Sequence, residues 1–428
     1  ASDVYKRQKI FSNILKAWRS CYAKLLSSML LMFLPGIIFA QDTGGPFADW
    51  AAYGQTATVG SSGSDEDVTI DNANYTVHTP LGLAWIAWVT NNKKTSSTLT
   101  HAPATTGFEN CTVTLDQDID LADATLPVTD KSWIPIGKGD LFNANRTTFK
   151  GTFNGNGYLI KGLTITQNTY TPIGLFGLAE GTKIQNLGVE LSTTGIQINL
   201  TNNYVGVIAG CLKANGSIDN CYTTGNGTIT VTDTNNGENN IGGITGYSNT
   251  GTIKNCYSTI DISGAGALVG GIVGFANGTN NSITTCFATG SLEGKTVAGI
   301  AAYGSSTSCL ALNPTIKYTA GGNYYRVGSY GKTDALSYAT AKMQVYNGDT
   351  PATFIPSDNQ EKHGHDCYTQ TSLTFLGDAW DTSGDNLPRL KIKNADGSYS
   401  TWPTGLSQPS DNLSKSTYLS VSDTHLRA

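Results

Sequence analysis

The sequence predicts an all-β protein, a right-handed parallel β-helix with a short N-terminal helical cap and a C-terminal closing segment. Two near-copies of one unit indicate this fold. Gly242–Gly246 precedes Gly251–Tyr257, and Gly270–Gly274 precedes Asn281–Phe287, with an offset of 28 residues. Self-similarity at a period of roughly 20–50 residues is typical of solenoids and related arrays. The composition agrees, because 49 of the 428 residues are glycine and only 14% are charged.

A four-residue corner is the most regular part of the unit. Its copies begin at Ile160, Ile184, Ile218, Ile253 and Ile283, with a degraded copy at Ser306. The steps between them are 24, 34, 35, 30 and 23 residues, so the loops vary while the corner is kept. This variation suits a stacked coil better than a repeat of two packed helices. The third position is Gly162, Asn186, Asn220 or Asn255, residues that enter the left-handed conformation at low cost.

Short strands surround each corner. After the corner the apolar residues alternate with period two, which predicts a strand. A second, small and apolar strand is expected at Gly174–Gly177, Val205–Gly210, Ile241–Gly246, Val269–Gly274 and Val297–Ala302. No amphipathic helix separates these strands. A parallel β-helix therefore fits best, in which each coil adds one rung at about 4.8 Å.

The N-terminal region predicts export. Residues 1–8 and 420–427 resemble translated sequencing adapters, and we exclude both from the fold prediction. Lys16, Arg19 and Lys24 precede the apolar run Leu25–Phe39, which has the order of a signal peptide. That run is too short for the roughly 20 residues of a membrane span. We assign residues 1–40 to this leader and expect an exported protein at the cell surface, associated with the outer membrane or secreted, with no membrane span in the mature chain.

The remaining chain divides into three segments. Residues 41–76 are polar and are expected to form loops, and residues 77–393 are expected to form the repeat domain with its caps. In that domain Thr79–Thr90 predicts a helix that begins at Pro80 and covers the open end of the coil. Thr333–Tyr346 predicts a second short helix, and Phe375–Leu390 predicts the closing segment. Residues 394–428 are rich in Ser, Asp and Pro and predict a linker or tail.

The charge argues against a nucleic-acid partner. The formal net charge is −5, and removal of residues 1–40 leaves 21 basic against 31 acidic side chains. Nucleic-acid binding usually requires a basic patch or stripe, and none remains in the mature sequence.

Several motifs together resemble the GLUG-repeat family of bacterial exported proteins. They are Trp133–Gly137, the run Phe149–Gly157, Gly174–Gly177 and Gly270–Gly274, and the segment Leu81–Ala87 is similar to the N-terminal part of that family. The likeness spans roughly Thr79–Gly304, with Ala302 in place of an expected glycine. It implies an adhesin-like, β-helical protein that is secreted or surface-associated, or a non-catalytic part of a larger secreted protein.

The cysteines predict a structural ladder. Of eight cysteines, four lie at equivalent or nearly equivalent corners: Cys221, Cys256, Cys286 and Cys309. Leu163 and Leu187 take the same position, so this position is apolar and interior, where a free cysteine acts as a small hydrophobic residue. An exported chain can also form disulfides, and a bond between neighbouring rungs stays open as an alternative. No cofactor is expected.

The metal and catalytic motifs are weak. His363, His365, Asp366 and Cys367 form the one compact group of metal-ligand types, but their spacing matches no zinc motif, and we expect no metal site. A glycosidase needs two carboxylates about 5–10 Å apart. The outward corner position carries Lys161, Gln185, Asp219, Lys254 and Thr284, which is too mixed for a repeated catalytic pattern. No catalytic residue is assigned.

The outward position after the corner offers a binding stripe. Tyr222, Tyr257 and Phe287 each follow the corner cysteine and are expected to stack into an exposed surface. The leading hypothesis is therefore a non-enzymatic, adhesin-like or surface-display module that binds a glycan or protein ligand at a cell surface. The alternatives are a polysaccharide-active β-helix enzyme, either a lyase or a glycosidase, and a spacer in a larger secreted protein.

Overall fold

The computed structural model describes residues 48–61, 66–166, 171–201, 203–232, 239–278, 281–328, 334–335, 337–340, 342–352, 365–366, 373–402 and 408–419. The chain divides into two compact units, Ala1–Ala48 and Asp49–Ala428. All described residues except Ala48 belong to the second unit, and the predicted signal peptide lies outside them. Within the described ranges, no helix has the length and apolar character needed to cross a membrane.

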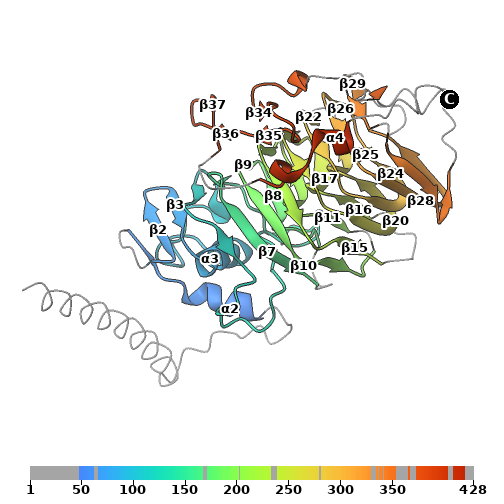
Figure 1. The fold of residues 1–428 in the computed structure, drawn as a ribbon. Helices are drawn as coiled ribbons and strands as arrows, with labels where there is room; N and C mark the ends of the chain where they lie inside the picture. Colours follow the sequence, from blue (N-terminus) through green and yellow to red (C-terminus); the bar gives the residue numbers. More distant parts are fainter. Residues whose placement is uncertain are drawn as a thin grey trace, which may run out of the picture. The chain divides into compact units, whose positions relative to one another are not determined.

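The second unit is mostly β and is built as a parallel β-solenoid. The chain passes repeatedly through three sheets, and most strands pair in parallel with their counterparts one coil later (Figure 1). The first sheet contains the strands before each corner: β1 (Val59–Gly60), β2 (Val68–Asp71), β3 (Asn74–Val77), β4 (Thr112–Leu115), β6 (Thr152–Asn154), β9 (Lys183–Gln185), β13 (Ser217–Asp219), β18 (Thr252–Lys254), β22 (Ser282–Thr284), β26 (Ser306–Thr307) and β29 (Asp334–Ala335).

The other two sheets follow the corner. One bends strongly around the coil and contains β5 (Ile119–Asp120), β7 (Leu159–Ile165), β10 (Gly188–Ile198), β11 (Tyr204–Gly206), β14 (Tyr222–Gly225), β15 (Ile229–Val231), β16 (Asn240–Gly242), β19 (Tyr257–Ser258), β20 (Ile262–Gly270), β23 (Phe287–Ala288), β24 (Leu292–Ala298), β27 (Leu310–Ala311), β28 (Thr315–Tyr325), β30 (Tyr338–Ala339), β31 (Gln344–Asn347), β32 (Thr350–Pro351) and β33 (His365–Asp366). The third is five-stranded and contains β8 (Phe176–Glu180), β12 (Ala209–Lys213), β17 (Thr245–Asn249), β21 (Val273–Asn277) and β25 (Ala301–Tyr303).

Equivalent residues of successive coils form interior columns. One column is made by side chains that pair in register and are at most 1% exposed: Phe153, Ile184, Ile218, Ile253 and Ile283. Full burial of such a side chain stabilises a fold by about 1.5–3 kcal/mol relative to exposure. Repeated burial of this kind, together with the hydrogen bonds between rungs, holds the coils in one register.

The corners adopt the predicted backbone. Gly162, Asn186, Asn220 and Asn255 have φ values of 73°, 52°, 60° and 52°, all in the left-handed region. The copy at Ile160, however, lies in the second sheet, whereas the other copies begin in the first. Ile160 pairs with Val189 and Leu163 with Leu191, whereas Phe153 is the true partner of Ile184. Leu163 is therefore buried in a different column from Leu187, because two similar tetrapeptides occur in the first coil.

The N-terminal cap contains the predicted helix. Helix α3 (Pro80–Asn91) begins after Thr79, whose Oγ1 accepts a hydrogen bond from Gly82 N at 3.1 Å. Its Leu83 and Ile86 side chains are fully buried. Residues 41–76 were predicted to be loops, and this is wrong for their described part. They form α2 (Ala48–Thr56) and strands β1, β2 and β3, which extend the first sheet beyond the first predicted rung.

The C-terminal region also differs from the prediction. The described part of Thr333–Tyr346 forms β29, β30 and β31, because these residues continue the coils in place of a helix. Residues 394–419 were predicted as a linker, yet their described part packs on the solenoid through buried Trp402 and partly buried Tyr399, Leu413 and Tyr418. We name residues 373–402 and 408–419 the C-terminal strap; it contains η4 (Thr374–Leu376), β34 (Trp380–Asp381), β35 (Arg389–Leu390), β36 (Ile392–Lys393), β37 (Tyr399–Ser400), η5 (Pro409–Asn412) and α4 (Lys415–Tyr418).

Candidate functional site

The predicted binding stripe is stacked but buried. The Tyr222 and Tyr257 rings lie 5.1 Å apart between centroids at 10°, and Tyr257 and Phe287 lie 4.7 Å apart at 9°. Their exposures are 1%, 0% and 0%. We name these three residues the buried aromatic column. The prediction of an exposed surface is wrong, because the C-terminal strap covers the column.

Two tryptophans of the strap lie against the column. Trp380 contacts Phe287 at a centroid distance of 5.3 Å, and Trp402 contacts Tyr222 at 5.9 Å. The Tyr257 hydroxyl donates to Gln408 Oε1 at 3.4 Å. Burial raises the pKa of both tyrosine hydroxyls above its ordinary value, so they stay neutral. In this arrangement the column is part of the core and has no ring face available to a ligand.

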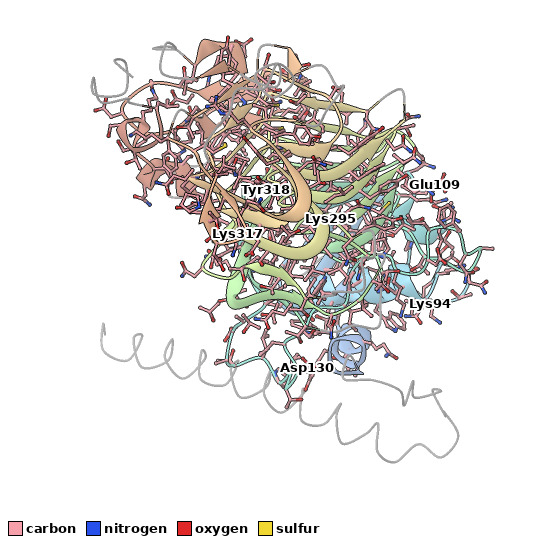
Figure 2. The ribbon with its side chains drawn as sticks, turned by 90° about the vertical axis from the view of Figure 1, so that its right-hand side faces the viewer. Lys94, Glu109, Asp130, Lys295, Lys317 and Tyr318 are labelled. Atoms are coloured by element: carbon pink, nitrogen blue, oxygen red, sulfur yellow. The ribbon has the colours of Figure 1, made fainter. Side chains whose placement is uncertain are left out.

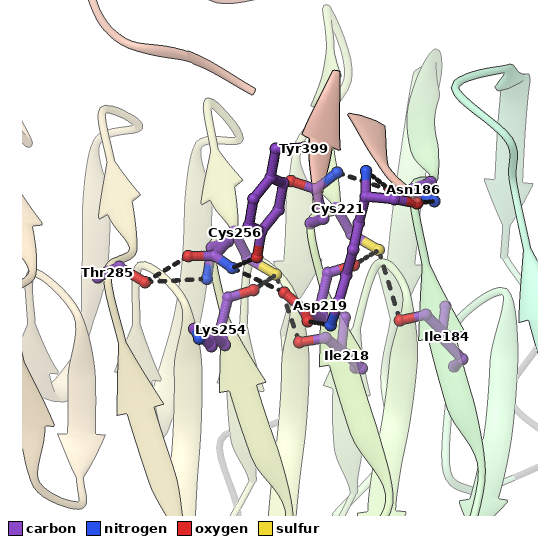
Figure 3. Close-up of polar contacts among 12 residues, drawn as sticks. Ile184, Asn186, Ile218, Asp219, Cys221, Lys254, Cys256, Thr285 and Tyr399 are labelled. Atoms are coloured by element: carbon purple, nitrogen blue, oxygen red, sulfur yellow. Dashed lines mark hydrogen bonds and ion pairs between the residues drawn. The ribbon is translucent and has the colours of Figure 1, made fainter. Parts of the chain in front are cut away.

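The corner asparagines fasten the strap. Asn186 Nδ2 donates to the Lys393 carbonyl and its Oδ1 accepts from Lys393 N, both at 2.9 Å. Asn220 Nδ2 donates to the Lys391 carbonyl at 2.6 Å, and Tyr399 Oη lies 3.3 Å from Asn255 Nδ2. Figure 3 labels Asn186 and Tyr399 among these contacts. The asparagines therefore form the turn with their backbone and hold the strap with their side chains.

An ion pair supports the same contact. The Lys393 ammonium hydrogen-bonds Asp219 Oδ2, and Asp219 Oδ1 accepts from Asn255 Nδ2 at 2.8 Å. Asp219, predicted only as an outward corner residue, is thus 9% exposed and serves the strap. Lysine and aspartate here have a structural role between two parts of the chain.

The cysteine ladder lies inside the coils. Cys221, Cys256, Cys286 and Cys309 are each 0% exposed, and Leu187 precedes them in the same column. Their thiols point to backbone carbonyls; Cys221 Sγ, for example, lies 3.2 Å from the Asp219 oxygen. All four are free cysteines, and so are Cys111 and Cys211. Their placement is that of small hydrophobic residues.

Buried thiols predict a loss of stability at alkaline pH. Burial raises the pKa of the Cys221 and Cys286 thiols, so they stay protonated while the unfolded chain ionises above about pH 8.5. Stability from this source is complete below that pH and falls as pH rises, by about 1.4 kcal/mol per thiol at one unit above. Urea unfolding between pH 7 and 9.5 under reducing conditions measures it. Cys286→Ala should give a smaller slope, and an unchanged slope would contradict the assignment.

A second aromatic column lies on the outer face of the five-stranded sheet. Tyr247, Phe275 and Tyr303 are in register on β17, β21 and β25. Adjacent rings are 5.8 Å and 4.4 Å apart and nearly parallel, at 19° and 8°. All three are partly exposed, and we name them the outer aromatic column. Because the rings face one another, their edges and substituents form the accessible strip.

Asparagines run beside the outer aromatic column. Asn249 and Asn277 are paired in register two residues after Tyr247 and Phe275, and Asn249 Nδ2 donates to the Tyr247 hydroxyl at 3.3 Å. Ring edges next to amides offer both apolar contact and hydrogen bonds. Sequence reasoning missed this face, although each aromatic residue comes three positions after the Ile of a Gly-Gly-Ile or Gly-Ile motif. That repeated position was the available signal.

A third cluster combines carboxylates with a lysine. A groove of about 220 Å³ is lined by Asp261, Glu293 and Lys317, among others. Lys317 Nζ lies 3.1 Å from Glu293 Oε1 and 2.8 Å from Asp349 Oδ1. Figure 2 shows Lys317 beside Lys295 and Tyr318 on this side of the solenoid. Hydrogen bonds to Asp349 and Glu293 raise the Lys317 pKa, so this amine stays protonated and is unsuited to act as a general base.

No metal site is found among the described residues. No group of three or more His, Cys, Asp and Glu side chains there has the arrangement of a metal site. His363 and Cys367 lie outside the described residues, and for His365 and Asp366 only the backbone of β33 is described. That this cluster binds no metal therefore stays a prediction.

These features define the chain as a parallel β-solenoid protein, built of stacked coils with a strap and an open outer face. No family model matches it. Over 147 residues it is 33% identical to halomucin of Haloquadratum walsbyi, a match that covers 32% of this chain and 1% of halomucin. Its fold is similar to a crystal structure from Bacteroides ovatus described as a candidate immunoglobulin A1 protease, with a TM-score of 0.55 and 18% identity. That match covers 79% of this chain and 94% of the other.

Proposed function

We propose that this chain is a non-enzymatic, exported binding module of the adhesin-like kind, and that the outer aromatic column binds a glycan. The supporting observation is the composition of that face. Tyr247, Phe275 and Tyr303 supply apolar edges on three consecutive rungs, and Asn249 and Asn277 supply amides beside them. A linear glycan repeats apolar CH groups and hydroxyls at regular intervals, and a surface that repeats once per rung matches such a polymer.

The class of exported protein rests on the sequence. The leader-like residues 9–40 and the resemblance to GLUG-repeat proteins support export and surface display. A right-handed winding of the coils is part of the proposal, because parallel strands joined by a crossover are almost always right-handed. The spacer hypothesis differs from this proposal in requiring no ligand on the outer face.

Glycan retention tests the proposal directly. The chain from Gln41 onward is immobilised and offered a panel of host and plant polysaccharides, with bound sugar and released reducing or unsaturated ends recorded in the same wells. Phe275→Ala should weaken retention about tenfold or more, as expected for a ring at the centre of a binding surface. Asn277→Ala, an exposed change, should weaken it less without affecting the fold.

Tyr346→Ala is the matched control. Tyr346 is a partly exposed tyrosine on β31, in a different sheet. Its loss should leave retention unchanged. Equal losses in Phe275→Ala and Tyr346→Ala would contradict the outer column as the site. If the unmodified chain neither retains nor cleaves any polysaccharide of the panel, a protein ligand or a spacer role is favoured.

The polysaccharide-active alternative has one observation in its favour. Asp261, Glu293 and Lys317 line one groove, and Asp349 pairs with Lys317, an arrangement that the sequence pattern did not reveal. Fragment release in the assay, lost in Glu293→Gln, would support this second function. Release without dependence on Glu293 would remove the groove from consideration.

A further inference from the structure

We propose that a groove at the N-terminal end of the outer face binds the anionic group, carboxylate or sulfate, of an acidic glycan; this inference rests on the proposed function. The groove has a volume of about 230 Å³ and is lined by Lys93, Arg146, Lys150 and Glu180 together with polar groups. Three cations against one carboxylate leave its lining positively charged. An anion entering it gains charge-assisted hydrogen bonds.

The guanidinium of Arg146 is held only loosely. Its Nη2 lies 3.6 Å from Glu180 Oε1, and its Nη1 is 3.4 Å from the Asn143 carbonyl. Its Nε is buried and has no hydrogen-bond partner in the described part of the chain. An unpaired donor of this kind is costly, and an external acceptor would satisfy it. The side chain is 27% exposed, which lets its planar fork turn towards a ligand.

Lys150 adds a second available charge. Its Nζ lies 3.5 Å from Glu109 Oε2, and the two side chains are 34% and 49% exposed. Exposed pairs of this kind contribute little stability, so exchange of Glu109 for a ligand anion costs little. Among the described residues, the Lys93 ammonium has no ion-pair partner.

The groove lies in register with the asparagines beside the outer aromatic column. Phe149 forms a bridge with Ala179, which places Lys150 beside Glu180. Glu180 pairs with Lys213, Lys213 with Asn249, and Asn249 with Asn277. One outward row therefore changes from charged to neutral along the sheet. A linear glycan lying along this row would place neutral rings near the aromatic column and an acidic substituent in the groove.

Paired polymers test this assignment. The chain from Gln41 onward is titrated with polygalacturonate and its carboxyl-reduced form, and with a sulfated glycan and its desulfated form. Arg146→Gln should weaken the acidic forms about tenfold and leave the neutral forms unchanged. Arg146→Lys keeps the charge but lacks the planar guanidinium, so its affinity for the acidic forms should lie between those of the unmodified chain and Arg146→Gln. The acidic polymer whose binding is weakened by Arg146→Gln shows whether the bound group is a carboxylate or a sulfate. Equal loss for acidic and neutral forms would overturn the proposal.

A small-ligand measurement separates the two proposals. The Arg146 Nε–H resonance, assigned by its absence in Arg146→Gln, is followed during titration with glucuronate, sulfate and glucose. We expect a shift with at least one anion and none with glucose. A shift without polymer retention would support anion binding in the groove and contradict glycan binding as the function of the chain. Retention on the aromatic column with no shift would overturn the groove alone. Thermal unfolding of each variant verifies that it is folded.

Discussion

Tyr257→Ala is expected to lower the free energy of unfolding by about 3–5 kcal/mol, the usual cost of removing a large buried ring. Tyr257 is 0% exposed and stacks between Tyr222 and Phe287. Its loss opens a cavity beneath the strap and removes one hydrogen-bond partner of Gln408. Urea unfolding followed by circular dichroism measures the change, and the tryptophan emission at Trp380 and Trp402 should shift to the red as the strap loosens.

Two variants calibrate this result. Tyr257→Phe keeps the stack and loses one hydrogen bond, so it should cost about 1 kcal/mol. Tyr346→Ala, on the partly exposed face of β31, should stay within about 1 kcal/mol. A cost below about 1 kcal/mol for Tyr257→Ala would mean that the strap does not seal the buried aromatic column.

Asn220→Ala is expected to lower the free energy of unfolding by about 2–5 kcal/mol, from two separate effects. Alanine at φ 60° meets the steric penalty of the left-handed region, about 1–2 kcal/mol. The lost amide also donates to the Lys391 carbonyl at 2.6 Å and to Asn186 Oδ1 at 2.7 Å. Each hydrogen bond contributes about 0.5–1.5 kcal/mol. Urea unfolding of the variant beside the unmodified chain measures the sum.

Asn220→Gly separates the two effects. Glycine keeps the left-handed turn but lacks the amide, so it removes the strap contacts while the corner is preserved. We expect Asn220→Gly to lower the free energy of unfolding by about half as much as Asn220→Ala does. The backbone amides of Lys391 and Lys393 should also exchange their hydrogens faster. If Asn220→Gly matched the unmodified chain in both measurements, the asparagine would serve the corner alone.

The solenoid was predictable because its signals are local. The left-handed corners are marked by Asn186, Asn220 and Asn255, whose backbone preference needs no tertiary context. The burial of the cysteines could be predicted because Leu187 occupies the position that Cys221 takes one coil later. Helix α3 was marked by Thr79 and Pro80 at its start. Each inference used residues within one coil or one helix, or the same position in successive repeats.

The remaining features depend on contacts far apart in the sequence. Tyr222 was read as exposed because its cover, Trp402, comes 180 residues later, and no pattern links the two. Residues 394–419 are polar in composition, so their few apolar side chains were not recognised as the ones that pack on the buried aromatic column. Arg146 and Glu180 meet only because Phe149 and Ala179 share a rung. Physical adjacency across coils, not local preference, created these sites.

The strap has a consequence for the order in which the protein is completed. Asn186 and Lys393 are 207 residues apart in the chain, and Tyr257 and Gln408 are 151 apart. A chain made from its N-terminus therefore finishes its coils well before the strap is available. During that interval Tyr222, Tyr257 and Phe287 face water as a continuous apolar stripe, the kind of surface that promotes aggregation of unfinished chains. The strap, made after the coils, is thus the segment that covers this stripe in the folded protein.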